Sequence, residues 1–149
     1  MHDNEKLRNP TVTVILPVRN EKDFIRGTLK SILAQDYPKA KIELVVADGN
    51  SSDSTINEIK KLKELFNSLK ILHNKHQTMP EGFNLALDRS KSEIILLLGG
   101  HSIIPRNYLS KSIANLKKHN AWCSGGIIEA EGVGFWGKII ASSISSVFG

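Results

Sequence analysis

The sequence has one cysteine, few aromatic residues and no long hydrophobic run. Because Cys123 has no second cysteine to pair with, a disulfide within the chain is excluded, and the composition fits a reducing compartment. The longest apolar run, residues 94–98, is far shorter than the roughly 20 residues that cross a membrane. Residues 1–10 are polar, which predicts a flexible N-terminus rather than a signal peptide, so we expect a cytoplasmic protein.

Several common motifs are also missing. The P-loop pattern, a G-x-G-x-x-G after the first strand and the hydrolase G-x-S-x-G are absent, which argues against these classes. The five histidines include no pair spaced four residues apart, so a zinc cage is not expected. The net charge is +5, but the basic residues are scattered and are not interleaved with aromatic ones. We therefore expect no nucleic-acid partner.

What the sequence does contain is an alternation of strand and helix patterns. Strands are expected at residues 11–16, 42–47, 69–72, 93–98 and 122–128, and helices at residues 24–33, 56–66, 80–90 and 105–116. This order predicts an α/β fold with a mostly parallel central sheet and helices on both faces. We expect Pro17 to end the first strand. The continuous apolar run of the fourth strand predicts a central strand that is buried on both faces.

Polar and glycine-rich segments follow three of these strands, at residues 17–21, 48–53 and 99–102. Ligands of open parallel sheets bind beyond the carboxyl ends of the strands, so these segments are expected to meet at one edge. Asp48 has two interpretations there: its carboxylate accepts hydrogen bonds from a base or a ribose, or it bonds to its own loop. Arg19 either pairs with a phosphate or is an ordinary surface charge.

Three stretches carry a resemblance to a known family: T-V-I-L-P-V-R-N-E (residues 13–21), S-I-L-A-Q-D-Y-P (31–38) and V-V-A-D-G-N-S-S-D-S-T (45–55). They resemble the inverting glycosyltransferases of family 2, which have a glycosyltransferase-A type fold. Two later stretches, G-G-H-S-I-I-P (99–105) and C-S-G-G-I-I-E (123–129), are similar to the succinoglycan-biosynthesis branch. The resemblance implies one nucleotide-sugar-binding domain over residues 11–149, truncated at its C-terminal side.

The resemblance also implies a reaction and a binding site. A sugar passes from a nucleotide diphosphate sugar to the hydroxyl of a glycan or lipid-linked acceptor, in the synthesis of bacterial exopolysaccharide or another cell-surface glycan. By position in the motifs, the residues implied to bind the nucleotide sugar are Pro17, Arg19, Glu21, Asp48, Asn84, Gly99 and Gly100.

The chain departs from the family where a D-x-D motif would hold Mg²⁺ or Mn²⁺ on the diphosphate. Gly99-Gly100-His101 stands there, so His101 is the one candidate metal ligand left in the motif. The family's catalytic base lies further along than this sequence extends, and no catalytic residue can be assigned. The alternative function is therefore an inactive nucleotide-sugar-binding module or a partner-binding fragment.

Apolar pairs recur at intervals of four in residues 135–148, from Phe135-Trp136 to Val147-Phe148. This spacing predicts a helix with one apolar side. Such a helix either packs on the sheet or docks on a membrane surface or a second copy of the chain. The second possibility would place the protein peripherally at the inner face of the membrane.

Overall fold

A four-stranded parallel sheet is the centre of the computed structural model, which describes residues 9–126. Its strands follow the order β3-β2-β1-β4, and each neighbouring pair is parallel. Their bounds are β1 (Val12–Val18), β2 (Ile42–Asp48), β3 (Leu69–His73) and β4 (Ile94–Leu97). Because all strands run in one direction, their carboxyl ends share one edge of the sheet, as the sequence predicted.

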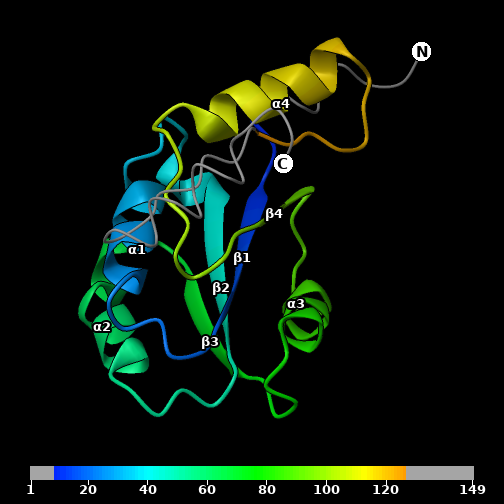
Figure 1. Ribbon diagram of the computed structural model, residues 1–149. Helices are drawn as coiled ribbons and strands as arrows, with labels where there is room; N and C mark the ends of the chain where they lie inside the picture. The colour runs from blue at the N-terminus through cyan, green and yellow to red at the C-terminus, as the bar shows by residue number, and fades with distance from the viewer. Residues whose placement is uncertain (1–8, 127–149) are drawn as a thin grey trace, which may run out of the picture.

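Helices cover both faces of this sheet, which confirms the predicted layers (Figure 1). The helices α1 (Ile25–Leu33) and α2 (Thr55–Lys61) lie on one side, and α3 (Met79–Leu87) lies on the other. The helix α4 (Tyr108–Lys118) crosses the end where β1 begins. Two short 3-10 helices, η1 (Lys39–Lys41) and η2 (Lys63–Leu65), complete the described elements.

Alternating side chains of β1 divide the core into two layers. Val14 and Leu16 are fully buried among residues of α1 and α2, whereas Ile15 is fully buried on the face that α3 covers. Successive side chains of a strand point to opposite faces, so a strand covered on both sides needs an unbroken apolar run. This requirement explains why four of the five residues 12–16 are valine, isoleucine or leucine, the exception being Thr13.

Pro17 does not end β1, contrary to the prediction, since the strand continues to Val18. The backbone of Val18 faces β2, where its carbonyl accepts the Gly49 N–H at 2.8 Å. Pro17 therefore faces the β4 side, where the last pairing is Ile15 with Leu97. An N–H at residue 17 would have no paired strand to bond with at that position. The lack of this N–H in proline therefore costs the sheet no hydrogen bond.

The prediction of a central, fully buried fourth strand is wrong for the described residues. Here β4 is the edge strand next to β1, and Leu97 is 47% exposed. Burial of a strand depends on neighbours that the apolar run itself cannot reveal. The expected fifth strand also fails in its described part, because residues 122–126 form no strand. Residues 127–128, and the apolar pairs of residues 135–148, lie outside the described part.

Several helix boundaries differ from the predicted ones. The helix expected over residues 56–66 is α2, which starts at Thr55 and ends at Lys61, before η2. The helix expected from Pro80 to residue 90 is α3, which starts one residue earlier and ends at Leu87. The helix expected from Pro105 is α4, which starts at Tyr108, because Pro105 first makes a turn that accepts the Tyr108 N–H at 3.0 Å. Within residues 9–126, no helix has the length and apolar character that crossing a membrane requires.

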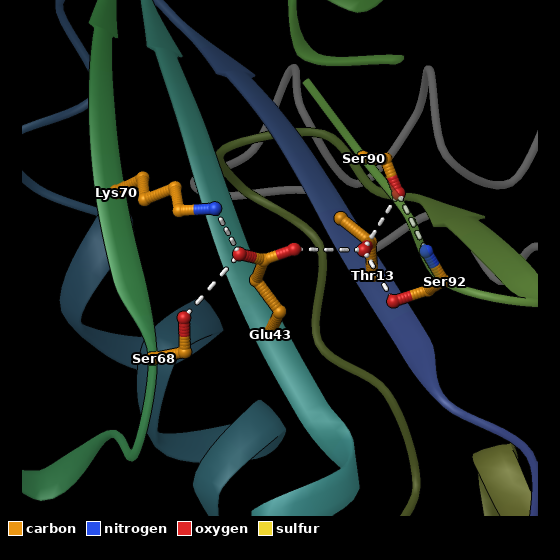
Figure 2. Close-up of polar contacts among 6 residues, drawn as sticks. All are labelled: Thr13, Glu43, Ser68, Lys70, Ser90 and Ser92. Carbon is orange, nitrogen blue, oxygen red and sulfur yellow. Dashed lines mark hydrogen bonds and ion pairs between the residues drawn. The ribbon is translucent and has the colours of Figure 1, made fainter. Parts of the chain in front are cut away.

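A polar network occupies the amino end of the sheet, on the face that also holds α3 (Figure 2). The fully buried Thr13 hydroxyl lies 2.8 Å from the hydroxyls of both Ser90 and Ser92, and 3.2 Å from a Glu43 carboxylate oxygen. The Lys70 ammonium is 2.6 Å from the other oxygen of Glu43. Every member of this network bonds to another member, as buried polar groups require.

Charge pairing controls the ionisation of Glu43. Burial raises the pKa of this carboxyl, but the Lys70 ammonium and hydrogen bonds from Thr13 and Ser68 lower it further, so the pKa of Glu43 lies below its ordinary value. Glu43 is therefore ionised in the folded protein at neutral pH.

Candidate functional site

The loops after β1 and β2 meet at the carboxyl edge of the sheet. The Gly49 N–H donates to the Val18 carbonyl, and a side chain at Gly49 would come within 3.4 Å of the Arg19 Cβ atom. The two loops are thus in direct backbone contact. The structure brings Arg19 and Asp48 to the same edge, as the sequence predicted for the segments that contain them.

Asn20 and Ser51 fasten these two loops together. Asn20 has a positive φ of 56°, its N–H donates to the Ser51 hydroxyl at 3.0 Å, and its side-chain carbonyl accepts the Ser52 N–H at 2.9 Å. Asparagine tolerates this left-handed conformation better than most residues. The Ser51 hydroxyl in turn donates to Asp48 at 2.6 Å. A chain of hydrogen bonds thus runs from the β1 loop to the Asp48 carboxylate.

Asp48 makes the local turn contact that was one of its two interpretations. Its carboxylate accepts the Ser51 N–H at 3.2 Å as well as the hydroxyl. The side chain is only partly buried. An ionised carboxylate has about four acceptor positions, so Asp48 keeps capacity for a ligand after these bonds are made.

A second link joins the same loops through Thr55 at the start of α2. The buried Thr55 hydroxyl accepts the Glu21 N–H at 2.8 Å and donates to Asp53, which also accepts the Lys22 N–H at 3.1 Å. The hydrogen bond from Thr55 lowers the pKa of Asp53 despite the opposing effect of desolvation. The Glu21 carbonyl accepts the N–H groups of Phe24 and Ile25, where α1 begins.

The tip of β4 contacts the β1 loop through Glu21. A Cβ atom at Gly100 would lie 2.7 Å from the Glu21 Cγ atom, so the glutamate occupies the space beside this glycine. Glu21 Oε1 is 3.2 Å from His101 Nδ1, and the Phe24 ring meets the imidazole edge-on with 6.5 Å between the ring centroids. The structure therefore brings Glu21, Gly100 and His101 together. Gly99 lies beside Ser102 and His101 instead.

Three buried polar residues that the sequence analysis did not select, two in α1 and one just after it, hold the segment that follows β4. Thr28 donates to the Gly100 carbonyl at 2.8 Å, Ser31 accepts the Ile104 N–H at 3.3 Å, and Gln35 donates to the Pro105 carbonyl at 2.8 Å. Residues 28 and 31 lie on one side of α1, and Gln35 follows two residues after the helix ends. A polar stripe on an otherwise apolar face was the signal that could have revealed them.

Pro17 lies against α3, the helix that carries Asn84. A Cβ atom at Gly82 of α3 would be 3.4 Å from the Pro17 Cβ atom, so the helix packs closely against the end of β1. Asn84 follows Gly82 by two residues, about 200° around the helix, so it lies on the exposed face of α3 and not on the face that packs against Pro17. The buried Asn74 links the end of β2 to the start of α3. Its backbone N–H donates to the Asp48 carbonyl, and its side-chain amide donates to the Thr78 carbonyl.

Metal-binding groups are sparse in the part of the chain that the structure describes. No three histidine, cysteine, aspartate or glutamate side chains lie close enough there to hold a metal ion together. The pair of Glu21 and His101 is the nearest approach to such a group at the tip of β4.

A family model extends over most of the chain. The model described as "Glycosyl transferase family 2" matches residues 13–145. The chain belongs to glycosyl transferase family 2. The match includes β1, β2 and β4, whose carboxyl ends carry the loops described above, and it covers all the predicted binding residues.

Two curated relatives of this family 2 chain come from archaea. The chain is 28% identical to the "Dolichyl N-acetyl-alpha-D-glucosaminyl phosphate 3-beta-D-2,3-diacetamido-2,3-dideoxy-beta-D-glucuronosyltransferase" of Methanococcus voltae, over 72% of this chain and 34% of that protein. It is 28% identical to "Glycosyltransferase AglE" of Haloferax volcanii, over 80% of this chain and 40% of the relative. The family 2 chain thus spans about a third to two-fifths of the length of these relatives. They do not single out the succinoglycan branch.

Solved structures of similar proteins confirm the glycosyltransferase-A type fold. The S. aureus TarS fragment 1–349 in complex with UDP matches with a TM-score of 0.67 and 25% identity, over 80% of this chain and 39% of that one. The mannosyltransferase PcManGT from Pyrobaculum calidifontis, in complex with GDP-Man and Mn²⁺, matches with a TM-score of 0.68 and 30% identity. That match covers 72% of this chain and 32% of PcManGT.

Proposed function

We propose that this family 2 domain binds a nucleotide diphosphate sugar at the carboxyl edge of β1, β2 and β4, for transfer of the sugar to an acceptor hydroxyl. The observation that carries the proposal is the double link between the β1 and β2 loops, through Asn20 with Ser51 and through Glu21 with Thr55. These links hold Arg19 and Asp48 at one edge before any ligand binds. Preorganised groups cost less to order when the ligand arrives.

Each predicted residue has a chemical role in this proposal. The Asp48 carboxylate accepts hydrogen bonds from a base N–H or a ribose hydroxyl, using the acceptor positions that Ser51 leaves free. The exposed Arg19 guanidinium pairs with a phosphate through two parallel hydrogen bonds. Pro17, Gly99 and Gly100 shape the floor of the site. Asn84 is assigned to the donor by its position in the family motif alone, since it lies on the exposed face of α3.

The names of similar proteins support the class of acceptor. The Methanococcus relative is named for a dolichyl-linked sugar phosphate, and the S. aureus relative TarS is named for poly(ribitol-phosphate). We infer a glycan or lipid-linked acceptor in the synthesis of a cell-surface glycan, at the inner face of the membrane. The motif of residues 99–105 favours an exopolysaccharide among these glycans.

Calorimetric titration with UDP-GlcNAc and with GDP-mannose tests the binding step. We expect the wild-type chain to bind at least one of them, and Asp48→Ala to weaken that binding at least about tenfold, because a hydrogen bond to a charged group contributes about 1.5–3 kcal/mol. Asp48→Asn removes the charge but keeps an oxygen that accepts the hydrogen bonds from Ser51. A comparison of this variant with Asp48→Ala therefore separates the effect of the charge on donor binding from the effect of the loop contact.

Asp36→Asn is the matched control, since this exposed aspartate follows α1 at the opposite edge of the sheet. It should bind the donor as the wild-type chain does. Absence of binding to both donors and to their nucleoside diphosphates would contradict the proposal, as would full affinity in Asp48→Ala.

The replacement of the D-x-D motif by Gly99-Gly100-His101 favours a second candidate, a module that binds the donor without transferring the sugar. Release of nucleoside diphosphate separates the two candidates. Release above the rate without protein indicates an enzyme, whereas tight binding without release indicates the module. Mg²⁺ or Mn²⁺, the cations that the family pattern implies, belong in both assays, because a divalent cation neutralises the departing diphosphate.

A further inference from the structure

The hydroxyl of Thr28, on α1, bonds to the tip of β4 beside the proposed donor site. We propose that Thr28 is a positioning residue, whose hydrogen bond to the Gly100 carbonyl fixes the place of this glycine and, through it, the place of Glu21. The inference rests on the proposed function for its effect on donor binding. Its effect on the geometry of the β4 tip can be measured without any nucleotide.

The tip of β4 lies beyond the part of the strand that the sheet holds. In the described part of the chain, the last backbone bond between this strand and β1 runs from the Leu98 N–H to the Ile15 carbonyl, at 3.0 Å. Gly99 and Gly100 follow, and two consecutive glycines have more backbone freedom than other residues. The place of the tip therefore depends on contacts outside the sheet.

Thr28 supplies such a contact from a buried position. It is fully buried, and its hydroxyl donates to the Gly100 carbonyl at 2.8 Å. Gly100 is buried as well, so loss of this bond would leave its carbonyl away from water and without its partner. The cost of a stranded carbonyl keeps the tip at the place where Thr28 can bond to it.

A displacement of Gly100 would act on Glu21 directly. A Cβ atom at Gly100 would stand 2.7 Å from Glu21 Cγ and 3.1 Å from Glu21 Cδ, so the glutamate side chain packs onto this glycine. Glu21 Oε1 also lies 3.2 Å from Nδ1 of the next residue, His101. Groups packed this closely transmit a shift to one another. Movement of the tip would therefore move Glu21 relative to the loops after β1 and β2.

Two further residues hold the later part of the same segment, which runs beside α1 (Figure 1). Ser31 accepts the Ile104 N–H at 3.3 Å. Gln35 donates to the Pro105 carbonyl at 2.8 Å and accepts an N–H at the start of α4 at 3.0 Å. These bonds remain when the Thr28 hydroxyl is removed. Its loss should therefore displace the tip without detaching the segment from α1.

A merely structural role, in which the Thr28 hydroxyl only stabilises the fold, is the competing explanation. Thr28→Val removes the hydroxyl and keeps the shape of the side chain, whereas Thr28→Ser keeps a hydroxyl. The matched control is Thr13→Val, which removes another fully buried threonine hydroxyl at the opposite end of the sheet. It should lower stability, as Thr28→Val does, but leave the β4 tip in place.

The ring C–H signals of His101 in the NMR spectrum of the full chain report the place of the tip. The Phe24 ring, just before α1, meets the imidazole edge-on with 6.5 Å between the centroids, so its ring current affects these signals. Thr28→Val should shift them, whereas Thr28→Ser and Thr13→Val should not. The signals are assigned by their absence in His101→Ala. Unshifted His101 signals in Thr28→Val would overturn the inference.

Calorimetric titration with UDP-GlcNAc and GDP-mannose measures the consequence for donor binding. We expect Thr28→Val to weaken binding about fivefold or more, the factor that corresponds to one hydrogen bond, and Thr28→Ser to restore it. Equal weakening in Thr28→Val and Thr13→Val would overturn the inference, because it would reflect lost stability alone. Urea unfolding checks that each variant is folded, and Thr28→Ala takes the place of Thr28→Val if the valine variant is not.

The two readouts separate this inference from the proposed function. If the wild-type chain binds neither donor nor their nucleoside diphosphates, the proposed function fails, and the His101 signals alone decide whether Thr28 positions the tip. If the wild-type chain binds a donor and Thr28→Val keeps full affinity, this inference fails and the proposed function stands.

Discussion

The two ends of the sheet carry polar side chains of similar chemistry that are used in opposite ways. At the amino end, Thr13 bonds to Glu43 and to two serines, and Glu43 pairs with Lys70 (Figure 2). The hydrogen-bonding groups of these side chains are thus used by other side chains. At the carboxyl end, Asn20 and Thr55 bond mainly to the backbone of neighbouring loops. The first arrangement leaves no polar group available to a ligand. The second holds the loops in place and leaves other side chains of those loops available to a ligand.

This difference has an energetic consequence. A buried network whose members satisfy one another stabilises the fold and leaves nothing for a ligand, since each lost partner strands a desolvated polar group. Side chains that hold loops leave neighbours such as Arg19 exposed. Substitutions at the amino end should therefore change stability, and those at the carboxyl end should change stability and donor binding together.

The largest effect is expected for Thr13→Val, which removes the hydroxyl and keeps the shape. Ser90, Ser92 and Glu43 then each lose a partner, which should lower the free energy of unfolding by about 1–3 kcal/mol. Urea unfolding measures this loss. Thr13→Ser keeps the hydroxyl and should lose less, and donor affinity should stay unchanged in both. If Thr13→Val lowered donor affinity without lowering stability, the amino end of the sheet would serve binding and not stability, contrary to the comparison of the two ends.

An intermediate effect is expected at Asn20. Its φ of 56° costs an ordinary residue about 1–2 kcal/mol, so Asn20→Ala should destabilise the fold by roughly that amount. It should also weaken donor binding, because the contact to Ser52 is lost. Asn20→Gly restores the backbone freedom but not the amide. If the glycine variant recovered both stability and affinity, the amide contact would have no role in shaping the site.

The smallest effect is expected for Lys70→Met. An ion pair with a half-exposed lysine contributes about 0.2–1 kcal/mol, and the loss should appear in urea unfolding at neutral pH. The pKa of Glu43 is lower in the folded protein than in the unfolded chain, so the unfolded chain takes up the proton first as the pH falls. The contribution of the pair is thus fully present above the ordinary glutamate pKa of about 4.3 and declines below it.

Stability curves measured from neutral pH down to about pH 3 should therefore converge for the wild-type chain and Lys70→Met, since the ordinary glutamate pKa lies near 4.3. Glu58, which pairs with Lys61 on α2, provides the control ion pair. Lys61→Met should leave the Thr13 network unaffected. A gap between the wild-type chain and Lys70→Met that widened on acidification would contradict the assigned ion pair.

Local chemistry accounts for the parts of the site that sequence reasoning found. Asp48 and the glycines of residues 99–100 follow apolar runs, and a parallel sheet places such positions at one edge. Contacts between residues distant in the chain could not be predicted from such local patterns. The stripe of Thr28, Ser31 and Gln35 bonds to residues some 70 positions away, and nothing in the helix pattern identifies those partners.

The sequence by itself determined the alternation of strands and helices, the parallel sheet and the edge at which the loops gather, because hydrophobic periodicity and turn residues act over short distances. Only the tertiary structure decided that β4 lies at the edge of the described sheet, that Pro17 stays within its strand and that Glu21 reaches His101. These outcomes depend on which segments become neighbours in space. Side-chain packing and backbone pairing between distant segments fix that choice, and no local pattern records it.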